Sequence, residues 1–169
     1  MIKASKYTTF QLFVLLHLYA RQLEEGTLME SAFDKRVKMT VKEFANLAPA
    51  EILPDNDIEI RQELDVLRSH LLITDTADKY YLTNTDGVIF VRKHIYSLDK
   101  KMSESQKNKS IIDRIQAKVE VKNYFKELLG KFKNKSQAQI VDNIVFEAKK
   151  FAGPTAITFL AQLLKDSGF

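Results

Sequence analysis

Apolar residues recur at helical spacing along most of the chain. Behind the candidate N-cap residues Thr8 and Thr9, two apolar stripes cover much of the first predicted helix. One stripe is Leu12, Leu15, Leu16, Tyr19 and Leu23, and the other is Phe10, Phe13, Val14 and Leu18. A helix that is apolar on two sides must be covered on both, either within its own domain or at a dimer interface. Gly26 is expected to end this helix.

Two further helices are predicted in the next forty residues. Thr40 and Glu43 form a T-x-x-E capping box, which starts a helix over residues 41–47. Asp55 or Asp57 is expected to open a longer third helix. Its apolar positions share one face: Ile60, Leu64, Leu67 and Leu71.

A small β-hairpin follows the third helix. Residues 72–75 and 79–82 are short β-like runs separated by a turn. Thr83 is then expected to cap a helix that continues to Leu98. This order of helices and hairpin predicts one folded unit over residues 7–98, which we call the head.

The remainder of the chain is predicted to be helical. A polar, lysine-rich stretch at 99–110 separates it from the head. One long helix over about 107–132 is expected, then a helix capped by Ser136 and a last helix over 155–165. We call residues 107–169 the annex and expect it to serve dimerisation or partner binding. The fold class is therefore mainly α with a small β-hairpin.

Composition excludes several classes of protein. The chain has 169 residues, of which 45% are hydrophobic and 28% charged, as in an ordinary globular domain. It has no cysteine, which excludes thiol catalysis, iron–sulfur clusters and cysteine zinc sites, and a cytoplasmic location is expected. The first apolar run, residues 10–20, is shorter than the roughly 20 residues that span a bilayer, so no membrane partner is expected.

Charge is distributed unevenly along the chain. The overall net charge is +4, but residues 1–99 carry a net −3, residues 100–135 a net +7, and residues 136–169 none. A concentrated positive segment attracts phosphate backbones or acidic protein surfaces. The alternative is a solvated helix face.

Two motifs lie between residues 40 and 95. They are Leu64-x-x-Leu67-x-x-x-x-Leu72-Ile73 and Tyr80-Tyr81-Leu82-Thr83-Asn84-Thr85-Asp86-Gly87. Together they resemble the winged helix-turn-helix of MarR-type and PadR-type transcriptional regulators, in which the second motif has the pattern Y-x-L-T-x-x-G. In this chain the spacing from Thr83 to Gly87 is one residue longer than in that pattern. The resemblance implies that the third helix is a recognition helix, the hairpin is the wing, and the protein binds DNA.

The chain departs from that family pattern in three places. Leu71 stands where the family commonly has glycine, so the end of the recognition helix is expected to differ. The wing carries Asp75 and Asp78 against a single Lys79. Residues 57–70 have a net charge of −2, which would repel DNA phosphates.

Two sets of residues are candidates for contacting DNA. The candidates for reading base edges are Arg61, Gln62, Arg68 and Ser69. The candidates for phosphate contacts are Lys42, Lys79, Arg114, Lys118, Lys122 and Lys126. The last four recur every fourth residue and would form a basic stripe on one long helix. Both sets could instead be the exposed sides of amphipathic helices.

The sequence therefore favours a double-stranded DNA-binding protein, a transcriptional regulator that acts as a homodimer. The alternative is a protein-interaction adaptor, whose acidic third helix would bind a basic partner, or whose basic segment would bind an acidic one. His17, His70 and His94 are scattered without a metal-binding pattern, and no catalytic constellation or cofactor motif is present. We expect no enzyme activity, metal or cofactor.

Overall fold

The computed structural model describes residues 2–26, 36–104 and 106–168. Its elements, in chain order, are η1 (Ala4–Lys6), α1 (Thr9–Glu24), β1 (Met39–Thr40), α2 (Val41–Leu47), α3 (Asp57–Ser69), β2 (Ile73–Thr76), β3 (Lys79–Leu82), α4 (Asp86–Glu104), α5 (Gln106–Arg114), α6 (Val119–Leu128), α7 (Gln137–Ala152) and α8 (Pro154–Asp166). The fold is mainly helical with a small antiparallel sheet, which confirms the predicted class. In the described ranges, no helix has both the length and the apolar character needed to cross a membrane.

The first helix begins and ends at the predicted residues. The Thr8 side chain accepts a hydrogen bond from the Gln11 backbone N–H at 3.1 Å, and the Thr8 N–H donates to the Gln11 side chain at 2.8 Å. This reciprocal pair satisfies two backbone donors at the start of α1. At the other end, Gly26 has a positive φ of 67°, a conformation that glycine adopts without strain.

The sheet contains one strand more than the hairpin predicted. Its order is β1-β3-β2, with Met39 opposite Tyr80 and Ile73 opposite Leu82. The two-residue strand β1 was not predicted because so short a segment has no detectable alternation. The hairpin turn is also tighter than expected, because only Ala77 and Asp78 lie between the strands.

The ends of α3 differ from the sequence prediction. Asn56, rather than Asp55 or Asp57, caps the helix by accepting a hydrogen bond from the Glu59 N–H at 2.9 Å. Ile60, Leu64 and Leu67 are buried as predicted, but Leu71 is 64% exposed. Leu71 has a positive φ of 63°, so it leaves the helix and its side chain departs from the apolar face. Leu71 thus adopts the left-handed conformation that the resemblance assigns to a glycine at this position, so the expectation of a different helix end was wrong.

The predicted long helix over 107–132 is wrong, because the chain divides it into α5 and α6. The Ile115 N–H bonds to the Ile112 carbonyl, three residues back, as α5 ends. In one continuous helix, Ile112 and Phe125 would point about 140° apart. Both side chains are fully buried, and the break between α5 and α6 allows both to face the core.

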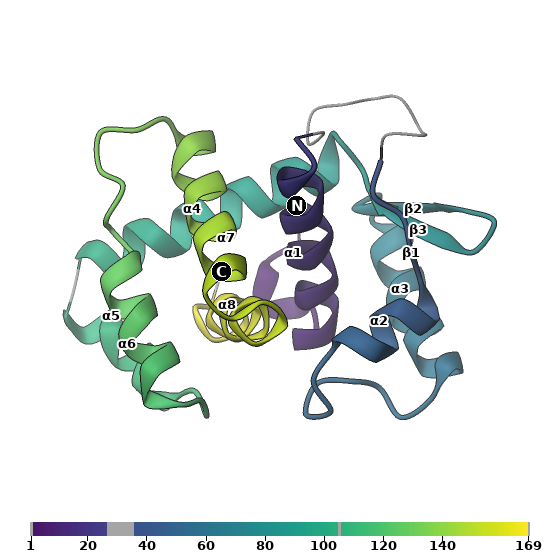
Figure 1. Ribbon diagram of the computed structural model, residues 1–169, viewed down its shortest axis with the longest axis horizontal. Coiled ribbons are helices and arrows are strands. Elements are labelled where there is room, and N and C mark those ends of the chain that lie inside the picture. Colours follow the sequence, from purple (N-terminus) through teal and green to yellow (C-terminus); the bar gives the residue numbers. More distant parts are fainter. Residues whose placement is uncertain (1, 27–35, 105, 169) are drawn as a thin grey trace.

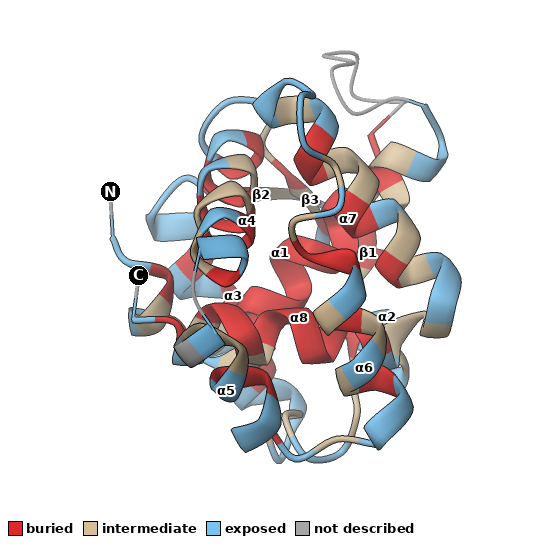
Figure 2. Cartoon of the chain, turned by 90° about the vertical axis from the view of Figure 1, so that its left-hand side faces the viewer, coloured by how far each residue is buried: buried red, intermediate tan, exposed pale blue. Residues whose placement is uncertain are grey.

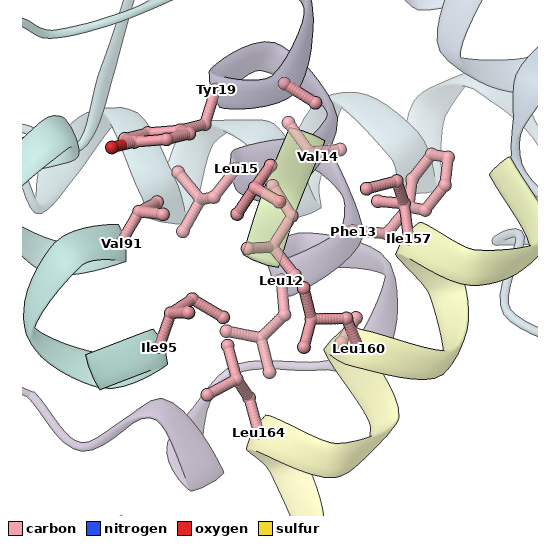
Figure 3. Packing of buried hydrophobic residues seen from close by; sticks show 14 of the residues in the cluster. Leu12, Phe13, Val14, Leu15, Tyr19, Val91, Ile95, Ile157, Leu160 and Leu164 are labelled. Atoms are coloured by element: carbon pink, nitrogen blue, oxygen red, sulfur yellow. The ribbon is translucent and has the colours of Figure 1, made fainter. Parts of the chain in front are cut away.

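A single apolar core includes side chains from the head and from the annex. Figure 1 shows α1 in the middle of the molecule, with α2, α3 and the sheet on one side and α5 and α6 on the other. Residues 10–20 of α1 are all buried (Figure 2). Figure 3 shows side chains of α1 packed against Val91 and Ile95 of α4 and Leu160 of α8. The two apolar stripes of α1 are therefore covered within the chain, so they no longer argue for a dimer interface.

Candidate nucleic-acid interface

The exposed face of α3 carries the four predicted base-reading residues. Arg61, Gln62, Arg68 and Ser69 are all exposed and fall within about 120° of the helix circumference. We call this surface the recognition face. The structure brings the four side chains to one side of one helix, opposite the buried residues that anchor it to the core.

Both arginines of the recognition face form ion pairs with carboxylates. Arg68 lies 3.0 Å from Asp75 of β2 and 3.1 Å from Asp65, one turn earlier on α3. Arg61 lies 3.5 Å from Asp78 at the tip of the hairpin. The Asp75 hydrogen bond, followed by the charge of Asp65, raises the pKa of the Arg68 guanidinium. The hairpin carboxylates therefore partly neutralise the positive charge of the two arginines.

Carboxylates outnumber cations over α3 and the hairpin. Residues 57–82 contain six acidic and three basic side chains. Asp65 lies between Arg61 and Arg68 on the same helical face and is itself exposed. A phosphate backbone approaching this surface would meet a net charge of −3 before any rearrangement.

Contacts with the N-terminus of α1 hold α3 in place. The Thr8 hydroxyl donates to the Glu63 carboxylate at 2.5 Å, and the Gln11 side-chain amide donates to the Glu63 backbone carbonyl at 3.1 Å. Near the end of α3, the Tyr7 hydroxyl lies 2.9 Å from His70 Nδ1. Glu63 therefore has a structural role that its sequence position did not reveal.

The predicted basic stripe of the annex is not continuous. Arg114 is the last residue of α5, whereas Lys118 is the N-cap of α6. Lys126 forms an ion pair with the Asp113 carboxylate at 2.6 Å, and Lys122 donates to the Asp113 backbone carbonyl at 3.1 Å. Two of the four cations thus bind the C-terminal end of α5, where positive charge stabilises a helix.

The other predicted phosphate contacts belong to two regions. Lys42 lies on α2 and Lys79 on β3, both in the head, and Arg114 and Lys118 lie in the annex. All four side chains are exposed. Their positions are compatible with contacts to an external anion, but they do not form one row.

The three histidines have separate structural surroundings. His17 is buried and stacks on Phe13, although its Nδ1 has no hydrogen-bond partner among the residues that the structure describes. Burial, together with the charges of Lys149 and Arg21, lowers the pKa of His17 to about 4. His94 Nδ1 lies 2.9 Å from the Phe90 carbonyl oxygen, and burial lowers its pKa. Among the described residues, no group of three or more histidine, aspartate and glutamate side chains is placed to hold a metal ion.

Sequence reasoning missed the ion pairs of the hairpin. It identified Asp75 and Asp78 as unfavourable charges in the wing, but not as partners of Arg68 and Arg61. Two arginines seven residues apart on one exposed helical face, followed by two aspartates three residues apart in a hairpin, are the only sequence signal of this pairing. That signal identifies partners only once the packing of the hairpin against α3 is known.

No protein-family model, curated protein or solved structure matches the chain. The function must therefore be inferred from the residues and topology of the chain itself.

Proposed function

We propose that the protein binds double-stranded DNA through the head and acts as a transcriptional regulator. The observation that carries the proposal is the topology of the head. It runs helix, strand, helix, helix, hairpin, with sheet order β1-β3-β2 and the recognition face exposed on α3. This order of elements supports the proposal, because it is the order expected of a winged helix-turn-helix, in which the second helix of the turn enters the major groove.

The ion pairs of the recognition face are compatible with this role. Exposed pairs stabilise a protein by about 0–1 kcal/mol, so Arg61 and Arg68 can exchange their carboxylate partners for base edges at small cost. Arginine pairs with guanine through two hydrogen bonds, and Gln62 has the chemistry to pair with adenine. The exposed cations Lys42, Lys79, Arg114 and Lys118 supply phosphate contacts in this proposal.

We further propose that the protein acts as a homodimer in the cytoplasm. Two copies would present two recognition helices to half-sites about one helical turn apart. The apolar stripes of α1 do not support the dimer, because α8 and α4 cover them. The proposal of a dimer therefore rests on the proposed DNA-binding function. Sedimentation of the protein with and without duplex tests it.

Duplex titration tests the proposal. Fluorescence anisotropy with a randomised duplex, repeated over a salt series, should give binding that weakens steeply as salt rises. Replacing Arg61 and Arg68 together by alanine should weaken binding to a selected site by about tenfold or more. The matched control is Arg21→Ala, which removes one cation from α1, away from the recognition face. The proposal fails if the wild-type protein does not bind at low salt, or if the double variant binds a selected site as tightly as the wild type.

The second candidate function is a protein-interaction adaptor. The excess of carboxylates over α3 and the hairpin favours it, because such a surface complements a basic partner. A lysine-rich peptide should then bind, as measured by calorimetry, and the reversals Asp65→Lys and Asp75→Lys should abolish that binding. Peptide binding without duplex binding would favour the adaptor over the DNA-binding protein.

A further inference from the structure

A surface cavity of about 270 Å³ lies between α4 and the segment that joins α6 to α7. Tyr96, Asp99, Lys100 and Ser103 line it from α4, at spacings of three, one and three residues, which place them on one helical face. Residues 130–135 provide much of the opposite wall, with Lys133 and Lys135 among them. The cavity is remote in sequence from the recognition face and shares no residue with it.

A specific contact fixes the two walls relative to each other. The Gly130 backbone N–H donates to the Asp99 carboxylate at 2.5 Å. Gly130 has a positive φ of 83°, and a Cβ atom there would lie 2.9 Å from Ser103 Cβ. Only glycine allows the connecting segment to approach α4 this closely without strain. The cavity is thus formed by close backbone packing.

Three lysines give the cavity its charge. Lys100, Lys133 and Lys135 line it, and their side chains are exposed. Among the described ion pairs, none involves any of these three ammonium groups. Among the described residues of the lining, Asp99 alone is acidic; it is buried, and its carboxylate already accepts the Gly130 hydrogen bond. Burial raises the pKa of the Asp99 carboxyl, whereas the hydrogen bond from Gly130 acts to lower it.

Size and lining indicate what kind of anion fits. The cavity lies just below the range of about 300–1,000 Å³ typical of drug-sized ligands. Tyr96 and Phe132 are half-buried in its wall and offer aromatic surface to an organic group beside the anion. Three lysines around one small cavity match the several oxygens and the charge of a phosphate.

We propose that this cavity is an anion site that binds a phosphate group through Lys100, Lys133 and Lys135. The phosphate is carried by a small phosphorylated molecule or by a nucleic-acid backbone; the recognition chemistry is the same in both. The site goes beyond the DNA-binding role proposed for the head and does not depend on it.

Amide chemical shifts test the site directly. Inorganic pyrophosphate is titrated into the ¹⁵N-labelled protein at constant ionic strength, with chloride as the comparison anion. The amides of Ser103, Gly130 and Asn134 should shift with saturation, whereas chloride should leave them unchanged. Replacing Lys133 and Lys135 together by alanine should weaken pyrophosphate binding by about tenfold. The control pair Lys3→Ala and Lys6→Ala, which removes two exposed lysines outside the cavity lining, should bind pyrophosphate as the wild type does.

The proposal is overturned if pyrophosphate shifts no amide around the cavity, or if the variant at Lys133 and Lys135 binds it as the wild type does. A second arm identifies the source of the phosphate. If saturating duplex displaces pyrophosphate and the same variant binds duplex more weakly, the backbone supplies the phosphate. If duplex and pyrophosphate bind together and the variant binds duplex normally, a small molecule supplies it. Failure of DNA binding itself would appear separately, as wild-type protein that binds pyrophosphate but no duplex.

Discussion

The recognition face of α3 and the cavity between α4 and the α6–α7 segment present positive charge in opposite ways. In the head, Arg61 and Arg68 both pair with carboxylates of the hairpin. At the cavity, no described ion pair involves the lining lysines, and the one carboxylate present is held by a backbone N–H. The comparison teaches that exposed cations differ in how readily they meet an external ligand: Arg61 and Arg68 must first exchange a carboxylate partner, whereas the lysines of the cavity have no such ion pair among the described residues.

The two regions nevertheless share one core. α1 packs against α3 and β3 of the head and against α7 and α8 of the annex. The charge of each surface is therefore not determined by the apolar core that the two regions share. The surfaces differ in charge, while the same helix supports both.

The largest expected effect comes from breaking the shared core. Leu160 of α8 is fully buried and packs near Leu12 of α1 (Figure 3), so Leu160→Ala should lower the free energy of unfolding by about 3 kcal/mol. Head and annex should still unfold in one transition, followed by circular dichroism and tyrosine fluorescence in urea. The control is Ile58→Ala, because Ile58 is 70% exposed and its loss should cost little. Two separate transitions would show that the regions are independent.

The next effect concerns His17, which lies in α1 close enough to α7 for the charge of Lys149 to act on it. Its folded pKa of about 4 lies below the ordinary 6.5, so the folded state favours the neutral ring. This contribution is fully present above pH 6.5 and is lost as the pH falls towards 4, with a loss of about 2 kcal/mol at pH 5. His94, whose pKa is also lowered, contributes in the same direction.

Urea titrations at pH 7 and pH 5 measure this loss. In His17→Leu the difference between the two pH values should shrink, leaving the loss due to His94 and an opposing contribution from Asp99, whose pKa is raised by burial. An unchanged difference would mean that His17 is not the group responsible.

A smaller effect should follow from removing the carboxylate partners in the head. Asp75→Asn with Asp78→Asn frees Arg61 from Asp78, leaves Arg68 paired with Asp65, and removes two negative charges near the proposed DNA surface. Duplex binding should tighten by about fivefold at low salt and by less at high salt. Glu51→Gln with Asp55→Asn removes the same charge from the segment between α2 and α3 and is the control. Equal tightening in both double variants would mean that only net charge matters.

Much of the fold follows from local sequence signals. Thr8, Thr40 and Ser136 each cap the predicted helix through their side chains, and residues 41–47 form a helix as predicted. These features depend on residues within a few positions of each other, which is why sequence reasoning found them.

The features that were missed depend on distant contacts. The break between α5 and α6 places Ile112 and Phe125 in one core, and the Asp99–Gly130 contact forms the cavity. Local periodicity predicted neither feature. Apolar residues recur at helical spacing across residues 107–132, so the pattern predicts one continuous helix, and it carries no information on the contact between Asp99 and Gly130. The four base-reading candidates were placed on one face correctly, since helical spacing alone determines that, but their function stays a prediction.

The smallest effect is expected at Leu71, where the head departs from the family pattern. A left-handed backbone costs an L-residue about 1–2 kcal/mol, and Leu71 holds φ 63° with an exposed side chain. Glycine relieves that strain, but it raises the conformational entropy of the unfolded chain, which lowers the free energy of unfolding by about 0.5–1 kcal/mol. Leu71→Gly should therefore raise the free energy of unfolding by about 0.5 kcal/mol.

The control for this substitution is Leu71→Ala, which removes the same side chain but keeps the strained backbone, and it should give no gain. A loss of stability in the glycine variant, measured by urea unfolding, would mean that the leucine side chain contributes more than its backbone conformation costs. Leu71 lines a surface cavity with Tyr7 and His70, and losing its packing there would lower the free energy of unfolding. The two variants separate these contributions, because alanine removes the packing alone and glycine removes both packing and strain.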